Sequence, residues 1–162
     1  MELIQDLSST SDLGQLSNEM TYQKYLMNRA GMKELFDEIS IPGYMVLYMA
    51  AKDDQKQPSQ DQKIYLREIA EKLQLSISQT SKIIGSLRDK GLIIWTHDGK
   101  GRQGTYITIT DMGRKKVEKQ EETLKGFYKN VIERFGKEDF ICLLKMMHRL
   151  ETIMKEEIEV TV

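Results

Sequence analysis

The spacing of apolar residues predicts a chain made mainly of helices. Over residues 12–37 apolar positions recur at intervals of three and four, which is typical of an amphipathic helix. These positions are Leu13, Leu16, Met20, Met27, Ala30 and Leu35. Pro42 fits the first turn of a second helix, because amide groups there have no partner within the helix. The polar stretch KDDQKQPSQDQK, residues 52–63, contains Pro58 and predicts a loop.

Two short helices joined by a tight turn are predicted in the middle of the chain. The sequence IYL at residues 64–66 predicts a short edge strand, and LREIAEKL at residues 66–73 predicts a helix with one apolar side. In the following stretch, LSISQTSKIIGSLRDKGLI, Ser76 and Gln79 have the spacing of a capping box. The second helix is therefore expected to begin directly after Ser76 and to end before Gly91.

This second helix has two different faces when its residues are placed on a helical wheel. One face is expected to pack in the core and carries Ile77, Thr80, Ile83, Ile84 and Leu87. The opposite face carries Ser78, Lys82, Gly85, Ser86 and Asp89, with Gln79 at its margin. No acidic residue precedes Asp89, so the positive N-terminal end of the helix is not neutralised by its own side chains.

A hairpin and two long helices complete the predicted elements. The sequences IIWT at residues 93–96 and TYITIT at residues 105–110 are rich in branched and aromatic residues, which is typical of strands. A long helix is expected from Thr110, and Gly136 is expected to separate it from a last helix over residues 137–158. The terminal helices have wide apolar stripes that one small chain cannot cover, and they therefore predict a homodimer.

The composition indicates a folded protein without a disulfide framework. The 162 residues are 40% hydrophobic and 30% charged, and the one cysteine, Cys142, suits a reducing compartment. No segment approaches the roughly 20 uninterrupted apolar residues of a membrane helix. The N-terminal sequence MELIQDLSSTSD lacks the basic start and apolar core of a secretory signal, so a cytoplasmic location is expected.

Positive charge is concentrated in the middle of the chain. Residues 63–116 carry 11 Lys and Arg against 5 Asp and Glu, whereas the whole chain has a net charge of −1. A basic centre between acidic flanks suggests a polyanionic partner. The alternative is a chance segregation of charges on solvated faces.

The two short helices form a predicted helix-turn-helix unit, whose second helix suits the major groove of DNA. Small hydroxyl side chains at Ser76, Ser78 and Thr80 permit a close approach to DNA. Gln79 can pair with adenine, and Lys82 can reach guanine or a phosphate. The alternative is a helix whose polar side chains only face water.

The segment between the predicted strands, HDGKGRQG at residues 97–104, predicts a basic hairpin tip. Lys100 and Arg102 are placed to contact phosphates or the minor groove, with His97 nearby. Two cations on a hairpin are common by themselves. A helix-turn-helix followed directly by a basic hairpin is less common, and this order predicts a winged helix-turn-helix.

Over residues 12–158 the chain resembles the MarR family of bacterial transcription regulators. The resemblance rests on LREIAEKLQLSISQTSKIIGSLRDKGLI, on the basic wing and on ITITDMGRKKV. It implies DNA binding, with Lys82 where the family often has arginine or lysine and Arg102 at the first arginine of the family's wing motif. Gly101 and Gln103 replace the aspartate and the second arginine of that motif, which predicts a looser wing. The resemblance also implies a dimer built from the N- and C-terminal helices.

Methionine and tyrosine side chains on the first two predicted helices mark a second candidate site. The effector cavity of the family lies between the arm and the DNA-binding lobe, so the resemblance implies a pocket for a small aromatic or amphiphilic effector. The candidate lining residues are Tyr22, Tyr25, Met45, Tyr48 and Met49. The alternative is that these side chains only pack the core and the dimer interface.

Other chemistries find little support in the sequence. The segment GKGRQG, residues 99–104, satisfies G-x-G-x-x-G but leads into a strand, so it does not predict a dinucleotide site. His97, His148 and Cys142 lack the spacing of a metal site. Cys142 is expected to be a buried small hydrophobe, and a redox-sensing thiolate near cations is the alternative. No catalytic constellation stands out, so neither an enzyme nor a cofactor is expected.

These segments predict a mainly α fold with a small β-hairpin wing, in which a winged helix-turn-helix core is flanked by long N- and C-terminal dimerisation helices. The expected divisions are an N-terminal arm and dimerisation helix at residues 1–40, a DNA-binding lobe at residues 41–112 and C-terminal dimerisation helices at residues 113–162. The predicted function is a repressor that binds a pseudo-palindromic operator in double-stranded DNA as a homodimer and is released by a small-molecule effector. The alternative is a winged-helix module that binds another protein and not DNA.

Overall fold

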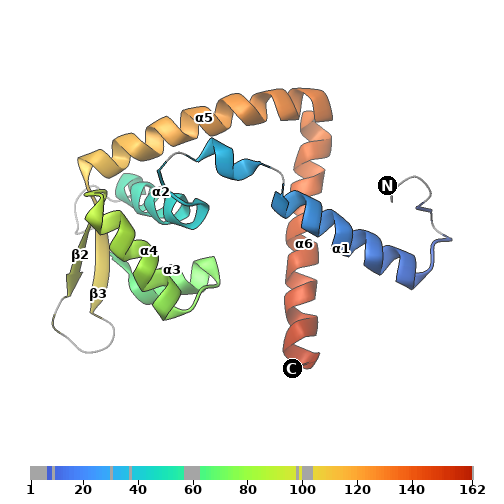
Figure 1. Ribbon diagram of the computed structural model, residues 1–162, viewed down its shortest axis with the longest axis horizontal. Helices are drawn as coiled ribbons and strands as arrows, with labels where there is room; N and C mark the ends of the chain where they lie inside the picture. The colour runs from blue at the N-terminus through green and yellow to red at the C-terminus, as the bar shows by residue number, and fades with distance from the viewer. Residues whose placement is uncertain are drawn as a thin grey trace. The chain divides into compact units, whose positions relative to one another are not determined.

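The structure is mainly helical with a small antiparallel sheet, as the sequence predicts (Figure 1). The computed structural model describes residues 7, 8, 10–29, 31–36, 38–56, 63–97, 99 and 104–161. The chain divides into two compact units, residues 1–41 and residues 42–162. In chain order the elements are α1 (Leu13–Arg29), the 3-10 helix η1 (Met32–Leu35), α2 (Ile41–Lys56), β1 (Ile64–Tyr65), α3 (Leu66–Leu73), α4 (Ile77–Asp89), β2 (Ile93–His97), β3 (Thr105–Ile109), α5 (Asp111–Phe135) and α6 (Lys137–Thr161).

The first unit contains α1 and η1. A reciprocal pair of hydrogen bonds caps the start of α1: the Gln15 amide donates to Asp12 Oδ1 over 2.9 Å, and the Asp12 amide donates to Gln15 Oε1 over 3.2 Å. The apolar period over residues 12–37 predicted helix throughout, whereas the structure has η1 as a separate short helix after Gly31. Glycine is a poor helix former, which explains the break.

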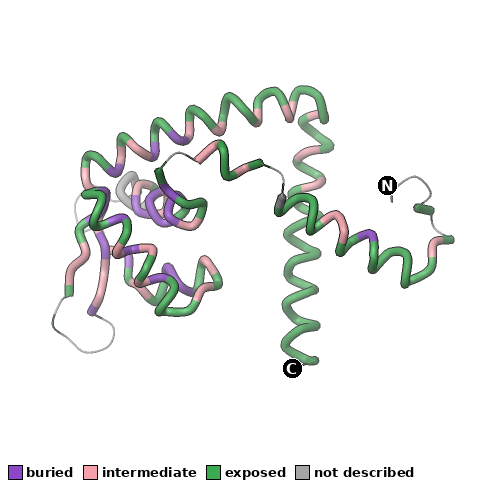
Figure 2. Tube along the Cα trace, viewed as in Figure 1, coloured by how far each residue is buried: buried purple, intermediate pink, exposed green. Residues whose placement is uncertain are grey.

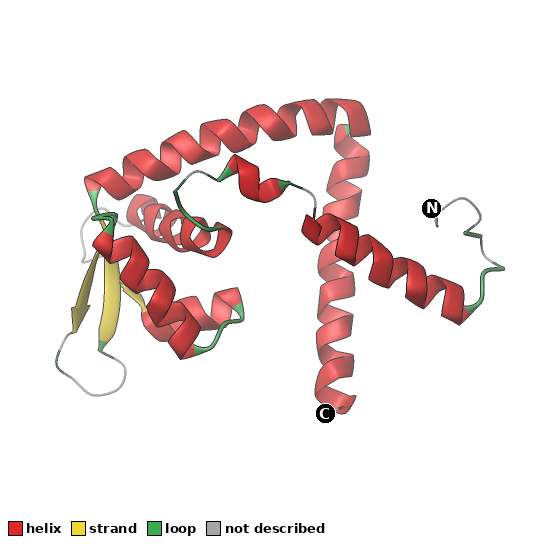
Figure 3. Ribbon diagram, viewed as in Figure 1, coloured by secondary structure: helices red, strands yellow, loops and turns green. Residues whose placement is uncertain are grey.

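The second unit contains a three-stranded antiparallel sheet with the order β1-β3-β2, so β1 is an edge strand as predicted. Ile64 pairs with Ile107 and Ile93 pairs with Ile109, and all four side chains are buried. Figure 3 shows β2 and β3 side by side, next to α4. Buried and half-buried residues alternate over the last three positions of β3, which is the pattern of a sheet with one face against helices.

The core of the second unit lies among α2, α3, α4 and the sheet. Its fully buried side chains come from all of these elements, and they are Leu47, Ile69, Ile84, Ile107, Val46 and Thr80. Figure 2 shows that buried positions also follow the first half of α5, whereas α6 has none. The C-terminal helix therefore contributes almost nothing to this core within one chain.

The start of the loop after α2 was predicted too early. Residues 52–63 were expected to form a loop, but α2 continues to Lys56. The reason is local, because Lys, Asp and Gln are compatible with a helix and the first strong helix breaker is Pro58. Pro58 itself lies outside the described residues.

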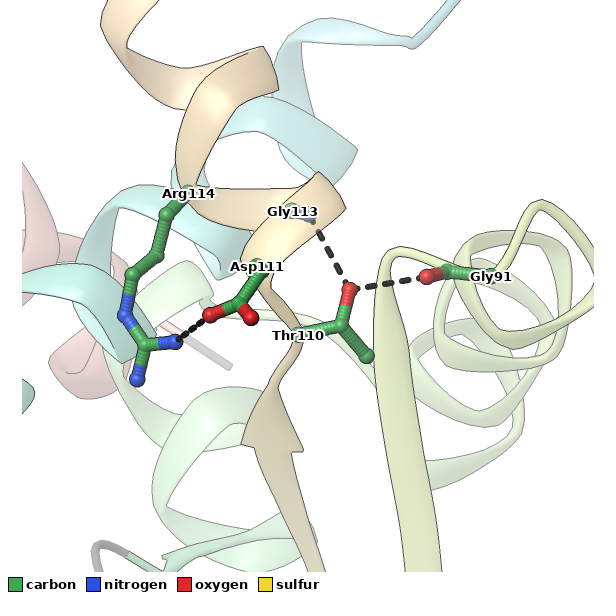
Figure 4. Close-up of polar contacts among 5 residues, drawn as sticks. All are labelled: Gly91, Thr110, Asp111, Gly113 and Arg114. Carbon is green, nitrogen blue, oxygen red and sulfur yellow. Dashed lines mark hydrogen bonds and ion pairs between the residues drawn. The ribbon is translucent and has the colours of Figure 1, made fainter.

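One junction joins the end of α4, the start of β2 and the start of α5 (Figure 4). The Thr110 hydroxyl donates to the Gly91 carbonyl over 2.8 Å and accepts from the Gly113 amide over 3.0 Å. The Thr110 amide donates to the Leu92 carbonyl over 3.1 Å. Thr110 is thus the N-cap of α5 and also holds the turn that ends α4.

Two glycines at this junction are required by its geometry. Gly91 has φ +71, a left-handed conformation that favours glycine. The amides of Gly91 and Leu92 donate to the carbonyls of Arg88 and Leu87, which is the Schellman pattern of a helix end. Gly113 is required for a different reason, because a Cβ added there would lie 2.2 Å from the Leu92 carbonyl oxygen.

Gly113→Ala is expected to lower the free energy of unfolding by about 1–3 kcal/mol, because the added methyl group forces α5 away from Leu92. Urea denaturation measures this change. Gly126→Ala is the matched control, since a Cβ at that position of α5 meets nothing within 4 Å. An unfolding free energy that is the same in the Gly113 variant as in the wild type contradicts the close packing at the junction.

Candidate nucleic-acid interface

The turn between α3 and α4 sets the angle between these two helices. Gln74 has φ 53 and ψ 45, a left-handed conformation that is uncommon outside glycine. The amides of Gln74 and Leu75 donate to the carbonyls of Glu71 and Ala70 over 3.2 Å and 2.9 Å, so α3 also ends in the Schellman pattern. Two residues later α4 begins, which gives the tight helix-turn-helix unit that the sequence predicts.

The capping box at the start of α4 is present as predicted. The Ser76 hydroxyl accepts from the Gln79 amide over 3.1 Å, and Gln79 Oε1 accepts from the Ser76 amide over 3.0 Å. The Ser76 hydroxyl also donates to Gln79 Oε1 over 3.0 Å. These bonds begin the helix at Ile77, the residue expected from the sequence.

The capping role limits what Gln79 can offer to a base. A bidentate pair with adenine needs the side-chain oxygen as an acceptor and the side-chain nitrogen as a donor. Gln79 Oε1 already accepts two hydrogen bonds from Ser76. A full pair with adenine therefore requires the capping box to open, whereas a single bond donated by the side-chain nitrogen does not.

The exposed face of α4 carries two of the predicted contact residues. Ser78 and Lys82 are exposed, and they lie opposite the buried residues Thr80, Ile84 and Leu87. The first turn of α4 contains no acidic residue. A positive helix end and a nearby lysine therefore face solvent together, which is an arrangement suited to an anion.

Two expectations for α4 are wrong. Thr80 was predicted to contact DNA, but its side chain is 0% exposed and its hydroxyl donates to the Ser76 carbonyl over 2.9 Å. It is a core residue whose polar group is satisfied within the helix. Ile77 was predicted to lie in the core, but it is 49% exposed. As the first residue of the helix, it precedes the turns that carry Thr80 and Ile84 into the core.

A contact that the sequence did not reveal joins α4 to the wing. The Arg88 guanidinium lies 5.4 Å from the centre of the Trp95 ring, a cation–π distance. Arg88 also pairs with Asp89 over 2.8 Å, which neutralises the acidic residue at the end of α4. The contact of Arg88 with Trp95 was not predicted, because the two residues belong to different elements and only the fold brings them together.

The wing consists of β2 and β3. At its described end His97 is opposite Thr105, and the Thr105 hydroxyl and His97 Nδ1 are 2.8 Å apart. The next described residue, Gly99, has φ +73. Lys100, Arg102, Gly101 and Gln103 lie outside the described residues, so the predicted wing contacts and the predicted looser wing stay predictions.

The five candidate effector residues lie on two helices. Tyr22 and Tyr25 are on α1 in the first unit, where Tyr25 is 53% exposed. Met45, Tyr48 and Met49 are on α2 in the second unit, where Met45 is 38% exposed. Of the five, Tyr48 lines a described cavity, and the joint pocket stays a prediction.

This cavity lies between α2 and α5 and has a volume of about 90 Å³. Its lining residues are Tyr48, Ala51, Lys52, Arg114, Val117, Glu118 and Glu121. Hydrogen bonding to the Tyr48 phenol raises the pKa of Lys52. Burial raises the pKa of the nearby Tyr44 phenol, and Glu121 raises it further. The cavity walls therefore combine a phenol with groups of both charges.

The sequence also raised a role for Cys142, a metal site and a membrane helix. Cys142 was expected to be buried, but it is exposed because α6 packs no residue into a core within this chain. Among the described residues, no three His, Cys, Asp or Glu side chains are grouped to hold a metal ion. In the same part of the chain, no helix is long and apolar enough to cross a membrane.

Comparisons with known proteins identify the fold. No protein-family model matches the sequence, and the comparison with curated protein sequences gives no match. The structure is similar to that of NMB1585, a MarR family regulator from Neisseria meningitidis, with a TM-score of 0.64 and 19% identity over 94% of this chain and 100% of that chain.

Two further solved structures are similar to the structure of this chain. One is the PcaV transcriptional regulator from Streptomyces coelicolor in complex with its natural ligand, with a TM-score of 0.63 and 16% identity over 92% of this chain and 98% of that chain. The other is BpsR from Bordetella bronchiseptica, whose DNA binding is regulated by 6-hydroxynicotinic acid, with a TM-score of 0.65 and 14% identity over 84% of this chain and 98% of that chain. The chain has a MarR-like winged-helix fold.

The variants Ser76→Ala and Ser78→Ala are expected to distinguish the residue that caps α4 from a residue that lies on its exposed face. Loss of the Ser76 cap is expected to lower the free energy of unfolding by about 0.5–2 kcal/mol. Ser78→Ala is expected to change this free energy by less than about 0.5 kcal/mol, because Ser78 is an exposed residue of the helix. Denaturant unfolding of both variants tests the assignment, and equal losses of stability contradict it.

Proposed function

We propose that the chain is a transcription regulator that binds specific sites in double-stranded DNA. In this proposal α4 enters the major groove, and the wing contacts the adjacent phosphates or minor groove. Ser78 and Lys82 of α4 face the bases, Ser76 and Gln79 start the helix near a phosphate, and Arg102 acts from the wing. MarR-like regulators with this fold support the proposal.

The observation that carries the proposal is the exposed face of α4. Ser78 and Lys82 share this face with a helix start that has no acidic residue in its first turn. The one carboxylate of the helix, Asp89, lies at the opposite end and is paired with Arg88. A phosphate near the start of α4 therefore meets positive charge and no carboxylate from this helix.

A homodimer is part of the proposal. Along α6 many large apolar side chains are exposed, and they include Leu144, Met147, Leu150, Ile153 and Ile158. A helix that exposes so many apolar side chains needs a partner to bury them. A second copy of the chain is the proposed partner, and its two-fold symmetry places two α4 helices on a pseudo-palindromic operator with half-sites about one helical turn apart.

Release from DNA by a small effector is the most specific part of the proposal. PcaV is a regulator with a natural ligand, and the DNA binding of BpsR is regulated by 6-hydroxynicotinic acid. An aromatic or amphiphilic molecule is proposed to act here, and its candidate contacts are Tyr22 and Tyr25 on α1 and Met45, Tyr48 and Met49 on α2. In this proposal the regulator is a repressor, and the effector favours a conformation in which the two α4 helices no longer match the operator spacing.

The second candidate function is a winged-helix module that binds a protein through the same face. The positive charge of residues 63–116 favours DNA over this alternative. Salt dependence distinguishes the two, because binding to DNA releases counterions from the phosphates.

Affinity for duplex DNA is expected to fall steeply as salt rises. The wild-type protein is first used to select fragments from the genome that encodes it, and the dissociation constant of a selected fragment is then measured over a salt series. Each phosphate neutralised by the protein is expected to contribute about −0.9 to the slope of log affinity against log salt. Failure to retain any genomic fragment at low salt removes DNA binding and favours the protein-binding module.

Lys82→Ala is expected to weaken binding to the selected fragment by about 1–3 kcal/mol and to relax the choice of base at one position if Lys82 reads a base. Binding to a set of single-base variants of the fragment measures both effects. Lys119→Ala removes an exposed lysine from α5 and is the charge-matched control. Equal losses in the two variants indicate that Lys82 acts only through the net charge of the protein.

A further inference from the structure

Gly85 occupies the middle of α4, on the face that carries Ser78 and Lys82. It lies three residues after Lys82 and seven after Ser78, so the three positions follow one side of the helix. The buried residues Thr80, Ile84 and Leu87 lie on the other side. Gly85 itself is half-buried, and it lies within the surface that α4 presents to its surroundings.

The fold does not require glycine at this position. Its backbone is helical, without the left-handed conformation found at Gly91. A Cβ added at Gly85 would meet nothing within 4 Å, whereas a Cβ at Gly113 would lie 2.2 Å from a carbonyl oxygen. Glycine inside a helix is destabilising relative to alanine, because it loses more backbone freedom on folding. Within this chain, packing thus permits alanine at this position, and backbone entropy favours it over glycine.

A molecule that approaches α4 from outside would supply a reason for glycine at this position. Glycine permits a close approach of a helix backbone to a ligand, because no side chain separates the two surfaces. The charges around Gly85 favour a polyanion: Lys82 lies one turn before it on the same face, and Asp89 one turn after it is paired with Arg88.

We propose that Gly85 is a specificity-determining residue of the DNA interface, and that its missing side chain lets the middle of α4 sit against the wall of the major groove. The inference rests on the proposed function and adds to it the depth at which α4 lies in the major groove. With a methyl group at position 85 the helix is lifted from the groove, so the contacts of Ser78 and Lys82 with base edges lengthen. Sequence discrimination then falls together with affinity.

The test is a pair of glycine-to-alanine variants. Gly85→Ala changes the exposed face of α4, and Gly126→Ala is the matched change in α5, where an added Cβ also meets nothing within 4 Å. Thermal unfolding, affinity for a genomic fragment selected by the wild-type protein and affinity for single-base variants of that fragment are measured for both. A Gly85→Leu variant extends the series to a larger side chain.

Both alanine variants are expected to unfold at the wild-type temperature or up to about 4 °C above it. Gly85→Ala is expected to lose about tenfold in affinity for the selected fragment and to discriminate less between its single-base variants. Gly85→Leu is expected to lose more, and Gly126→Ala is expected to bind as the wild type does.

Three outcomes overturn the inference while the proposed function stands. They are wild-type affinity in Gly85→Ala, an equal loss of affinity in both alanine variants, and a lower unfolding temperature confined to Gly85→Ala, which would mean that the glycine serves the fold. A wild-type protein that selects no duplex fragment at low salt overturns the proposed function, and the inference falls with it.

Discussion

The rest of the structure depends on one threonine hydroxyl. Thr110 donates to the Gly91 carbonyl and accepts from the Gly113 amide, so a single side chain ends one helix and begins another. Its backbone amide binds the Leu92 carbonyl, against which Gly113 also packs. These contacts join the end of α4, the start of β2 and the start of α5 at one corner of the structure. The direction of α4 in the lobe is consequently tied to the direction of α5.

The start of α4 is held by local bonds, and this has a functional consequence. Ser76 and Gln79 satisfy each other and leave Gln79 Oε1 fully occupied. The same residue was a candidate for reading adenine, so helix formation and base recognition compete for one oxygen atom. Lys82 has no such conflict, because it is exposed one turn further along the helix. In the proposed complex with DNA, discrimination between bases by α4 would therefore come mainly from Ser78 and Lys82, with Gln79 limited to its side-chain nitrogen.

A connection between the lobe and the C-terminal helix runs through the turn of the helix-turn-helix. Gln74 Nε2 donates to Glu151 Oε1 of α6 over 3.1 Å, across 77 residues of sequence. Both side chains are exposed, so this bond alone contributes little free energy. It nevertheless places a residue of α6 beside the turn that precedes α4.

Much of the local structure follows from the sequence, because short-range rules act on neighbouring residues. The S-x-x-Q box defines the start of α4, and Gly91 and Gly136 end helices. Tertiary structure decided what these rules do not contain. The helical wheel placed both Ile77 and Thr80 on the core face, but only Thr80 is buried. The contact of Arg88 with Trp95 and the exposure of Cys142 on α6 likewise depend on which elements pack together. A helical wheel assigns residues to a face, but only the neighbours of that face determine how far burial extends along it.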